Sequence, residues 1–164
     1  GILMRQREFP SWGYEVDNGA TTIWERWNSY VKGKGVHEPD MNSFSHYSFG
    51  AVCEWMMADL AGIDRAAPGF DRIKIAPRPT GGITRAAASM ETRHGKLACS
   101  WKIEGGKFVA EVTIPPNTTA EVTLPVKGGI EEGGAPVAGR PGIHAVNGNT
   151  LTVGSGVYHF SAPL

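Results

Sequence analysis

Apolar and polar residues alternate with two different periods along this chain, and the period changes near residue 63. In the first part, the apolar positions recur at helical spacing. The clearest predicted helix covers residues 44–60, where apolar side chains fall on more than one stripe. Asn42 or Ser43 is the expected amino-terminal cap, and Gly62 is expected to end the helix in a left-handed conformation. A helix that is apolar on so many sides needs neighbouring helices, so the sequence indicates one piece of a larger helical assembly.

From residue 80 onward, short runs alternate with period two and are separated by turn residues. This spacing predicts an antiparallel β-sandwich over residues 80–164. Asn147-Gly148 is a strong hairpin signal, whereas residues 127–142, with six glycines and two prolines, are expected to form a loop. The proline-containing stretch 64–79 is interpreted as a connection. The predicted parts are therefore residues 1–63, 64–79 and 80–164.

The composition excludes several classes of protein. The 164 residues carry 16 Lys+Arg and 16 Asp+Glu, and this zero net charge argues against a binder of nucleic acid or of membrane surfaces. No apolar run approaches the roughly 20 residues of a membrane helix. The two cysteines, Cys53 and Cys99, exclude a disulfide framework and are expected to be core thiols. His94, His144 and His159 lack ligand-like spacing and are expected at solvated or edge positions, so no metal site is predicted.

The beginning of the sequence resembles the end of a helix. Residues 1–7, GILMRQR, lack an initiator methionine and the apolar core of a signal peptide. We therefore expect a C-terminal fragment of a longer protein; the alternative is an ordinary amino terminus that has been trimmed.

Candidate chemistry gathers in the first part of the chain, where four of the five tryptophans lie. Glu25 stands between Trp24 and Trp27, and aromatic faces beside a carboxylate suit a carbohydrate site in which the carboxylate acts as a general base. The alternative is that the tryptophans are core residues and that Glu25 pairs with Arg26. His46, expected in the first turn of the predicted helix, is either a donor to a sugar hydroxyl or a core histidine.

Three motifs in the first part also resemble a known family. They are SWGY (residues 11–14), GATTIWERW (19–27) and MNSFSHY (41–47), followed by FDRIKIAPRP (70–79). In this order they resemble the C-terminal part of the catalytic domain of the bacterial α-L-rhamnosidases, glycoside hydrolase family 78, and the segment that leads into the family's C-terminal β-sandwich. The resemblance is specific in residues 11–79 and generic afterwards.

The resemblance implies a mixed fold, in which the last helical segment of an (α/α)6 barrel precedes an antiparallel β-sandwich. It also implies an enzyme that removes terminal α-L-rhamnose from rhamnosides with inversion. Glu25 maps onto the general base, His46 maps onto a residue that contacts the rhamnose ring, and Trp24 and Trp27 are candidates for lining the pocket. The general acid of the family lies in an earlier part of the barrel, which has no counterpart in this sequence.

Further expectations follow from that assignment. The partners would be α-L-rhamnosides and the missing part of the barrel, with self-association through the exposed barrel face as a further candidate. No cofactor is expected, since acid–base hydrolysis needs none, and the chain alone is expected to be inactive. The compartment stays open, with the bacterial cytoplasm slightly favoured. Two alternatives remain: a non-catalytic β-sandwich that binds carbohydrate or packs on another domain, and an (α/α)6 glycosidase or phosphorylase for another sugar.

Overall fold

The computed structural model of the chain describes residues 1–37 and 39–164. The chain divides into two compact units, Gly1–Cys53 and Glu54–Leu164. They are called unit 1 and unit 2 below, and each is described by itself.

Unit 1 consists of short helices and turns with little sheet. Its regular elements are α1 (Ile2–Arg5), α2 (Trp12–Asp17), β1 (Tyr30–Val31), β2 (Gly35–Val36), η1 (Pro39–Met41) and η2 (Ser48–Ala51). Strands β1 and β2 form an antiparallel pair. Of the buried apolar side chains among the described residues, Trp24 is the one that belongs to unit 1. Unit 1 therefore has only a small apolar interior of its own.

The predicted helix over residues 44–60 starts later than expected. Helical structure begins at Ser48 and continues through α3 (Val52–Trp55) and η3 (Met56–Leu60), the last being a π-helical turn. The proposed cap is absent because the Asn42 side chain donates to the carbonyls of Ser29 and His37, at 2.9 and 2.8 Å, and not to a helix end. Residues 43–47 are non-helical, so His46 precedes the helix and does not lie in its first turn.

This helical run is only partly covered within the described chain. Leu60 is buried, but Met56 is 39% exposed. Cys53, which the sequence analysis expected to be a core thiol, is exposed. Phe49 stacks on Trp27 and Trp55 packs against the sandwich core, so part of the apolar surface that led to that expectation is covered.

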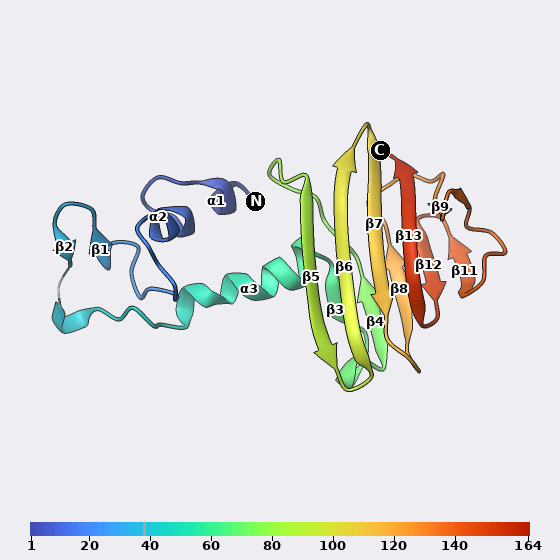
Figure 1. Cartoon of the computed structure of the whole chain (residues 1–164), viewed down its shortest axis with the longest axis horizontal. Helices are drawn as coiled ribbons and strands as arrows, with labels where there is room; N and C mark the ends of the chain where they lie inside the picture. The colour runs from blue at the N-terminus through green and yellow to red at the C-terminus, as the bar shows by residue number, and fades with distance from the viewer. Residues whose placement is uncertain (38) are drawn as a thin grey trace. The chain divides into compact units, whose positions relative to one another are not determined.

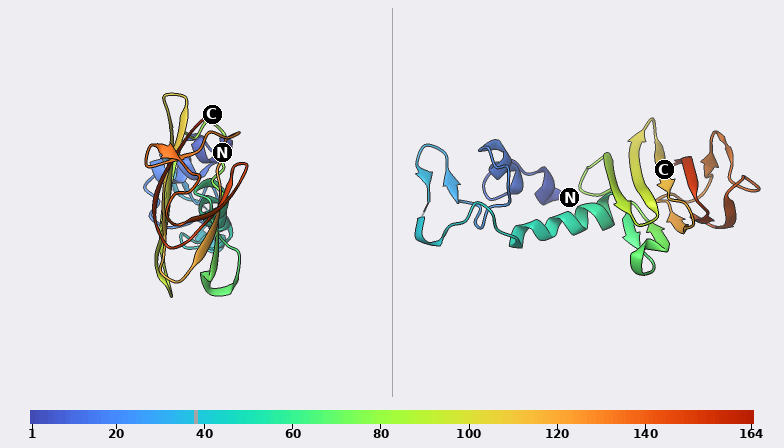
Figure 2. Two further views of the ribbon diagram at one scale, coloured as in Figure 1. Left: turned by 90° about the vertical axis from the view of Figure 1, so that its right-hand side faces the viewer. Right: turned by 60° about the horizontal axis from the view of Figure 1, so that its bottom comes forward.

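Unit 2 is a β-sandwich, as the alternating pattern predicts (Figures 1 and 2). One sheet has six strands in the order β10-β9-β13-β7-β6-β5, and the other has five in the order β11-β12-β8-β4-β3. The strands of the first sheet are β5 (Arg85–Thr92), β6 (Gly95–Glu104), β7 (Lys107–Ile114), β9 (Glu131–Glu132), β10 (Ala135–Pro136) and β13 (Gly156–Pro163). Those of the second are β3 (Ile63–Arg65), β4 (Arg72–Ile75), β8 (Thr119–Thr123), β11 (Ile143–Asn147) and β12 (Thr150–Val153).

The apolar positions of both sheets meet in one core. Its fully buried members include Phe108, Phe160, Leu97, Ile73, Val122 and Leu151. Trp101 points inward, as its place in the alternation indicates; its ring is 3% exposed, and its Nε1–H donates to the carbonyl of Leu60 at 2.8 Å. Cys99 is a core thiol, and burial raises its pKa to about 12. It is therefore protonated and unreactive at neutral pH.

The sandwich begins earlier in the sequence than predicted. The stretch 64–79, interpreted as a connection, contains β4 and most of β3, and the short 3-10 turn η4 (Pro68–Phe70) joins them. Strand β4 pairs in parallel with β8, so the second sheet is mixed and not wholly antiparallel. The expected loop over residues 127–142 contains the β9–β10 hairpin, which extends the first sheet beyond β13.

Two turns depend on glycine. Gly105 and Gly106 both have positive φ in the two-residue turn of the β6–β7 hairpin. A turn of this kind matches the right-handed twist of the two strands. Gly62, at φ +86°, follows the helical run as predicted, and a Cβ atom there would lie 2.2 Å from the nitrogen of Pro77. The Asn147-Gly148 signal is confirmed, since Asn147 pairs with Thr150 across the β11–β12 turn.

Among the described residues, no helix is both long and apolar enough to cross a membrane.

Candidate active site

The candidate residues Glu25 and His46 lie on two neighbouring segments of unit 1 without regular secondary structure. The backbone N–H of Glu25 donates to the carbonyl of Ser43, and the N–H of His46 donates to the carbonyl of Ile23, both at 2.8 Å. These two bonds hold residues 23–25 antiparallel to residues 43–46. The structure thus brings together two motifs that are separated by about twenty residues in the sequence.

The two tryptophans beside Glu25 have different roles. Trp24 is 4% exposed and packs edge-on against Phe44, with ring centroids 5.4 Å apart. Trp27 is half-buried and stacks on Phe49 at 4.0 Å, with the edge of Trp12 at 5.1 Å. Trp24 therefore anchors the segment that carries Glu25, while Trp27 belongs to an aromatic cluster next to it.

Glu25 itself is half-buried. The burial of Trp24 fits the alternative in which the tryptophans are core residues, whereas Trp27 is half-buried. A half-buried carboxylate on a segment held by backbone hydrogen bonds is accessible to water and has a defined place.

His46 is half-buried and stacks on Tyr47, with ring centroids 5.1 Å apart. The backbone N–H of Ser48 donates to its Nδ1 at 3.4 Å. An Nδ1 atom that accepts leaves the proton of a neutral imidazole on Nε2. His46 can therefore donate from Nε2 to a hydroxyl or to a carboxylate.

Helix α2 contacts this region through Trp12, whose ring centroid lies 5.1 Å from that of Trp27. Ser11, 2% exposed, caps α2 by accepting the backbone N–H of Tyr14 at 3.0 Å. Gly13 lies so close to the preceding segment that a Cβ atom would approach the carbonyl oxygen of Gln6 to 2.2 Å. These contacts explain two residues of the SWGY motif by packing alone.

Glu15 on α2 is a residue that the sequence analysis missed. Its side chain is 2% exposed, and burial raises its pKa from 4.5 to about 7, partly offset by a hydrogen bond from the backbone N–H of Trp24. The Oε1 atom of Glu15 and the Nε1 atom of Trp12 are both buried without a partner among the described residues. An acidic side chain next to Val16, which is 59% exposed, gives no periodic signal of burial.

Two hollows border the segment that joins α2 to Glu25. One, of about 310 Å³, is lined by residues that include Thr21, Trp24 and Phe44. The other, of about 250 Å³, is lined by residues that include Trp12, Glu15 and Ile23. Glu25, His46 and Trp27 line neither of these two hollows.

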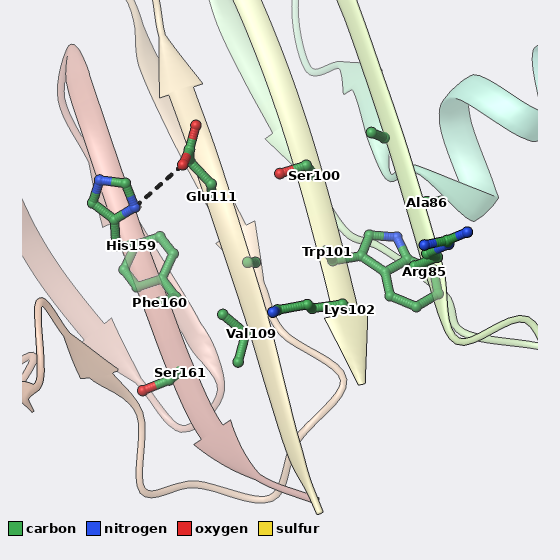
Figure 3. Close-up of a pocket in the computed structure, with 12 residues that line it drawn as sticks. Arg85, Ala86, Ser100, Trp101, Lys102, Val109, Glu111, His159, Phe160 and Ser161 are labelled. Carbon is green, nitrogen blue, oxygen red and sulfur yellow. Dashed lines mark ion pairs between the residues drawn. The ribbon is translucent and has the colours of Figure 1, made fainter. Parts of the chain in front are cut away.

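Unit 2 has a larger groove on the outer face of its six-stranded sheet, of about 540 Å³ (Figure 3). The strand register places Ala87, Ser100, Glu111 and His159 in one row across four strands. Glu111 and His159 form an ion pair at 3.4 Å. Trp101 contributes to the wall, but its ring is buried. The groove therefore has no exposed aromatic surface on which a sugar ring could stack.

The sandwich histidines lie near the surface. His144 and His159 are exposed, and the side chain of His94 is 20% exposed with its Nε2 2.7 Å from Asp71. Arg93 and His94 together hold the pKa of Asp71 below its usual value. Within the described parts of the chain, no group of three His, Cys, Asp or Glu residues has an arrangement that could hold a metal ion.

Comparison with known proteins connects both units to one family. Residues 2–60 match the family described as the bacterial alpha-L-rhamnosidase 6 hairpin glycosidase domain. Residues 62–136 match the bacterial alpha-L-rhamnosidase C-terminal domain.

Individual relatives carry the same description. An alpha-L-rhamnosidase of Streptomyces avermitilis is 48% identical over 123 residues, which is 75% of this chain and 12% of the relative. One from Formosa agariphila is 46% identical over the same length, 13% of that protein. This chain thus spans about one eighth of the length of these two relatives.

Solved structures agree with the described fold. The crystal structure of Streptomyces avermitilis alpha-L-rhamnosidase complexed with L-rhamnose matches 98% of this chain and 15% of its own, with a TM-score of 0.81 and 40% identity. The native enzyme of Aspergillus terreus matches 97% of this chain and 16% of its own, with a TM-score of 0.79 and 34% identity.

Proposed function

This chain belongs to the bacterial α-L-rhamnosidase family, and on that premise we propose that it is the C-terminal part of an inverting glycoside hydrolase. Its substrates would be terminal α-L-rhamnosides. The proposal rests on matches to two domains of the family in the expected order. The chain spans only 12–13% of these relatives, and this supports the view that it is inactive alone.

The observation that carries the proposal is the pairing of residues 23–25 with residues 43–46. Two backbone hydrogen bonds of 2.8 Å hold the carboxylate of Glu25 and the imidazole of His46 on neighbouring segments. A base and a hydrogen-bond donor on neighbouring, hydrogen-bonded segments suit the hydrolysis of a hydroxyl-rich substrate.

In the proposed mechanism, Glu25 removes a proton from a water molecule as the water attacks the anomeric carbon. The bond from that carbon to the leaving oxygen breaks, and a general acid outside these 164 residues protonates the leaving oxygen. The attack comes from the face opposite the leaving group, so the configuration inverts. His46 donates from Nε2 to a sugar hydroxyl, and Trp24 and Trp27 stiffen and line the adjacent wall.

The test replaces the base in the full-length enzyme that contains these residues. We expect Glu25→Ala to lower kcat on an aryl α-L-rhamnoside by about 10²-fold or more, because water then lacks its proton acceptor. Azide needs no base and can occupy the space that the side chain leaves. Added azide should therefore restore part of the rate.

Glu8→Ala is the matched control, since Glu8 is an exposed glutamate of the same unit. Its kcat should stay within about twofold of the unmodified enzyme. A folded Glu25→Ala enzyme that keeps its activity would refute the assignment, as would one that azide does not reactivate.

A further inference from the structure

Glu15 is a buried carboxylate that the proposed mechanism does not use. Its side chain is 2% exposed, and its Oε1 atom has no hydrogen-bond partner among the described residues. A carboxylate that is removed from water and incompletely paired costs free energy. The contacts of Glu15 should therefore show what its burial provides.

The backbone carbonyl and the side-chain carboxylate of Glu15 both contact the segment that leads to Glu25. The backbone N–H of Ala20 donates to the carbonyl oxygen of Glu15 at 3.0 Å. The backbone N–H of Trp24 donates to its carboxylate. The carboxylate of Glu15 therefore holds the last residue of the segment 20–24, while the first is held by the main chain of Glu15, whatever its side chain.

The same segment fixes the candidate base. Trp24 precedes Glu25 directly, and the N–H of Glu25 continues the series of hydrogen bonds by donating to Ser43. The buried ring of Trp24 packs on Phe44. Consequently, a shift of the Trp24 backbone moves Glu25 relative to the segment that carries His46.

We propose that Glu15 is a positioning residue, which holds the Trp24 backbone through its carboxylate oxygen and so sets the place of Glu25 against the attacking water. This inference rests on the proposed function of Glu25. It requires a hydrogen-bond acceptor at the end of a side chain as long as that of glutamate. It does not require a negative charge there, because an amide oxygen accepts the same N–H.

The test compares two conservative variants in the full-length enzyme. Glu15→Gln keeps the length and the acceptor but removes the charge, whereas Glu15→Asp keeps the charge and withdraws the acceptor by one methylene. We expect Glu15→Gln to retain kcat within about threefold, and Glu15→Asp to lower kcat about tenfold to 10²-fold with KM unchanged, since small misplacements of a catalytic group cost this much. Asp17→Asn, at an exposed carboxylate on the same helix, is the control.

A second measurement separates positioning of Glu25 from general support of the fold. In the Glu25→Ala background, azide attacks without a base, so adding Glu15→Asp should leave the azide-supported rate within about twofold. A loss of kcat in Glu15→Gln equal to that in Glu15→Asp would overturn the proposal. So would an azide-supported rate that falls as much as the rate of hydrolysis in the enzyme with Glu25.

The two proposals fail in different ways. Absence of azide reactivation in Glu25→Ala would remove the base and leave no function for Glu15 to support. Azide reactivation together with full kcat in Glu15→Asp would keep Glu25 as the base and refute the positioning role alone.

Discussion

At the scale of single residues, residue type alone does not predict which side chains of α2 are buried. Glu15 and Val16 are neighbours on α2, yet the acidic side chain is 2% exposed and the apolar one is 59% exposed. A hydrogen bond from the backbone N–H of Trp24 offsets part of the cost of burying the Glu15 carboxylate. Such a bond joins residues that the local pattern does not relate, so sequence reasoning proposed Glu25 from its motif and missed Glu15.

The raised pKa of Glu15 predicts a pH dependence of stability. Because its folded-state pKa is about 7 and its ordinary value is 4.5, the protonated form favours the folded state. That stabilisation is complete below about pH 4.5 and is lost as the pH rises through about 7. We expect unit 1 to lose on the order of 2 kcal/mol of unfolding free energy between pH 5 and pH 8 from this group.

Glu15→Gln removes the titration and should flatten this dependence. Hydrogen exchange of the Glu25 and His46 amides, measured at both pH values and corrected for intrinsic rates, reports the opening of unit 1. Asp17→Asn should keep the pH dependence of the unmodified chain. An unchanged pH dependence in Glu15→Gln would contradict burial as its source.

At the scale of elements, period-two alternation predicted most of the strands from β5 onward and the inward orientation of Trp101, but not the β9–β10 hairpin. It did not predict β3 and β4, which are short and lie among prolines within residues 63–79. Their pairing, including the parallel contact of β4 with β8, is set by distant strands. The start of the helical run was misplaced for a similar reason, because Asn42 binds carbonyls of Ser29 and His37.

The turn at Gly62 offers a test of one element boundary. Gly62→Ala must adopt a positive φ and place its Cβ against the backbone of Pro77. Gly134 has a similar φ of +80° with open space around it, so Gly134→Ala carries only the backbone strain. We expect Gly62→Ala to lower the unfolding free energy by about 1–3 kcal/mol more than Gly134→Ala, measured by urea denaturation. Equal losses would mean that the close approach to Pro77 is not rigid.

At the scale of the whole molecule, the two units differ in how much apolar surface they bury internally. Trp24 is the single buried apolar side chain of unit 1 among the described residues, while the sandwich core spans both sheets of unit 2. Of the twelve large apolar side chains exposed in the described chain, nine lie between Ile2 and Met56. This distribution fits the expectation that the first part belongs to a larger helical assembly.

The difference predicts that unit 1 opens at a lower free energy than unit 2. In the chain alone, the amide of His46 should exchange with solvent faster than those of Phe108 and Val112, which lie in the centre of the sandwich. Hydrogen exchange followed by mass spectrometry checks this order. Equal protection of the two units would contradict the view that unit 1 lacks part of its core.

The central claim is that Glu25 is the general base of an inverting α-L-rhamnosidase. The most direct measurement is the configuration of the rhamnosyl azide that the full-length Glu25→Ala enzyme forms from an aryl α-L-rhamnoside, determined by NMR. Direct attack by azide on the face opposite the leaving group predicts the β product. A product of retained α configuration would indicate a covalent intermediate and would contradict the assignment of Glu25 as the base of an inverting enzyme.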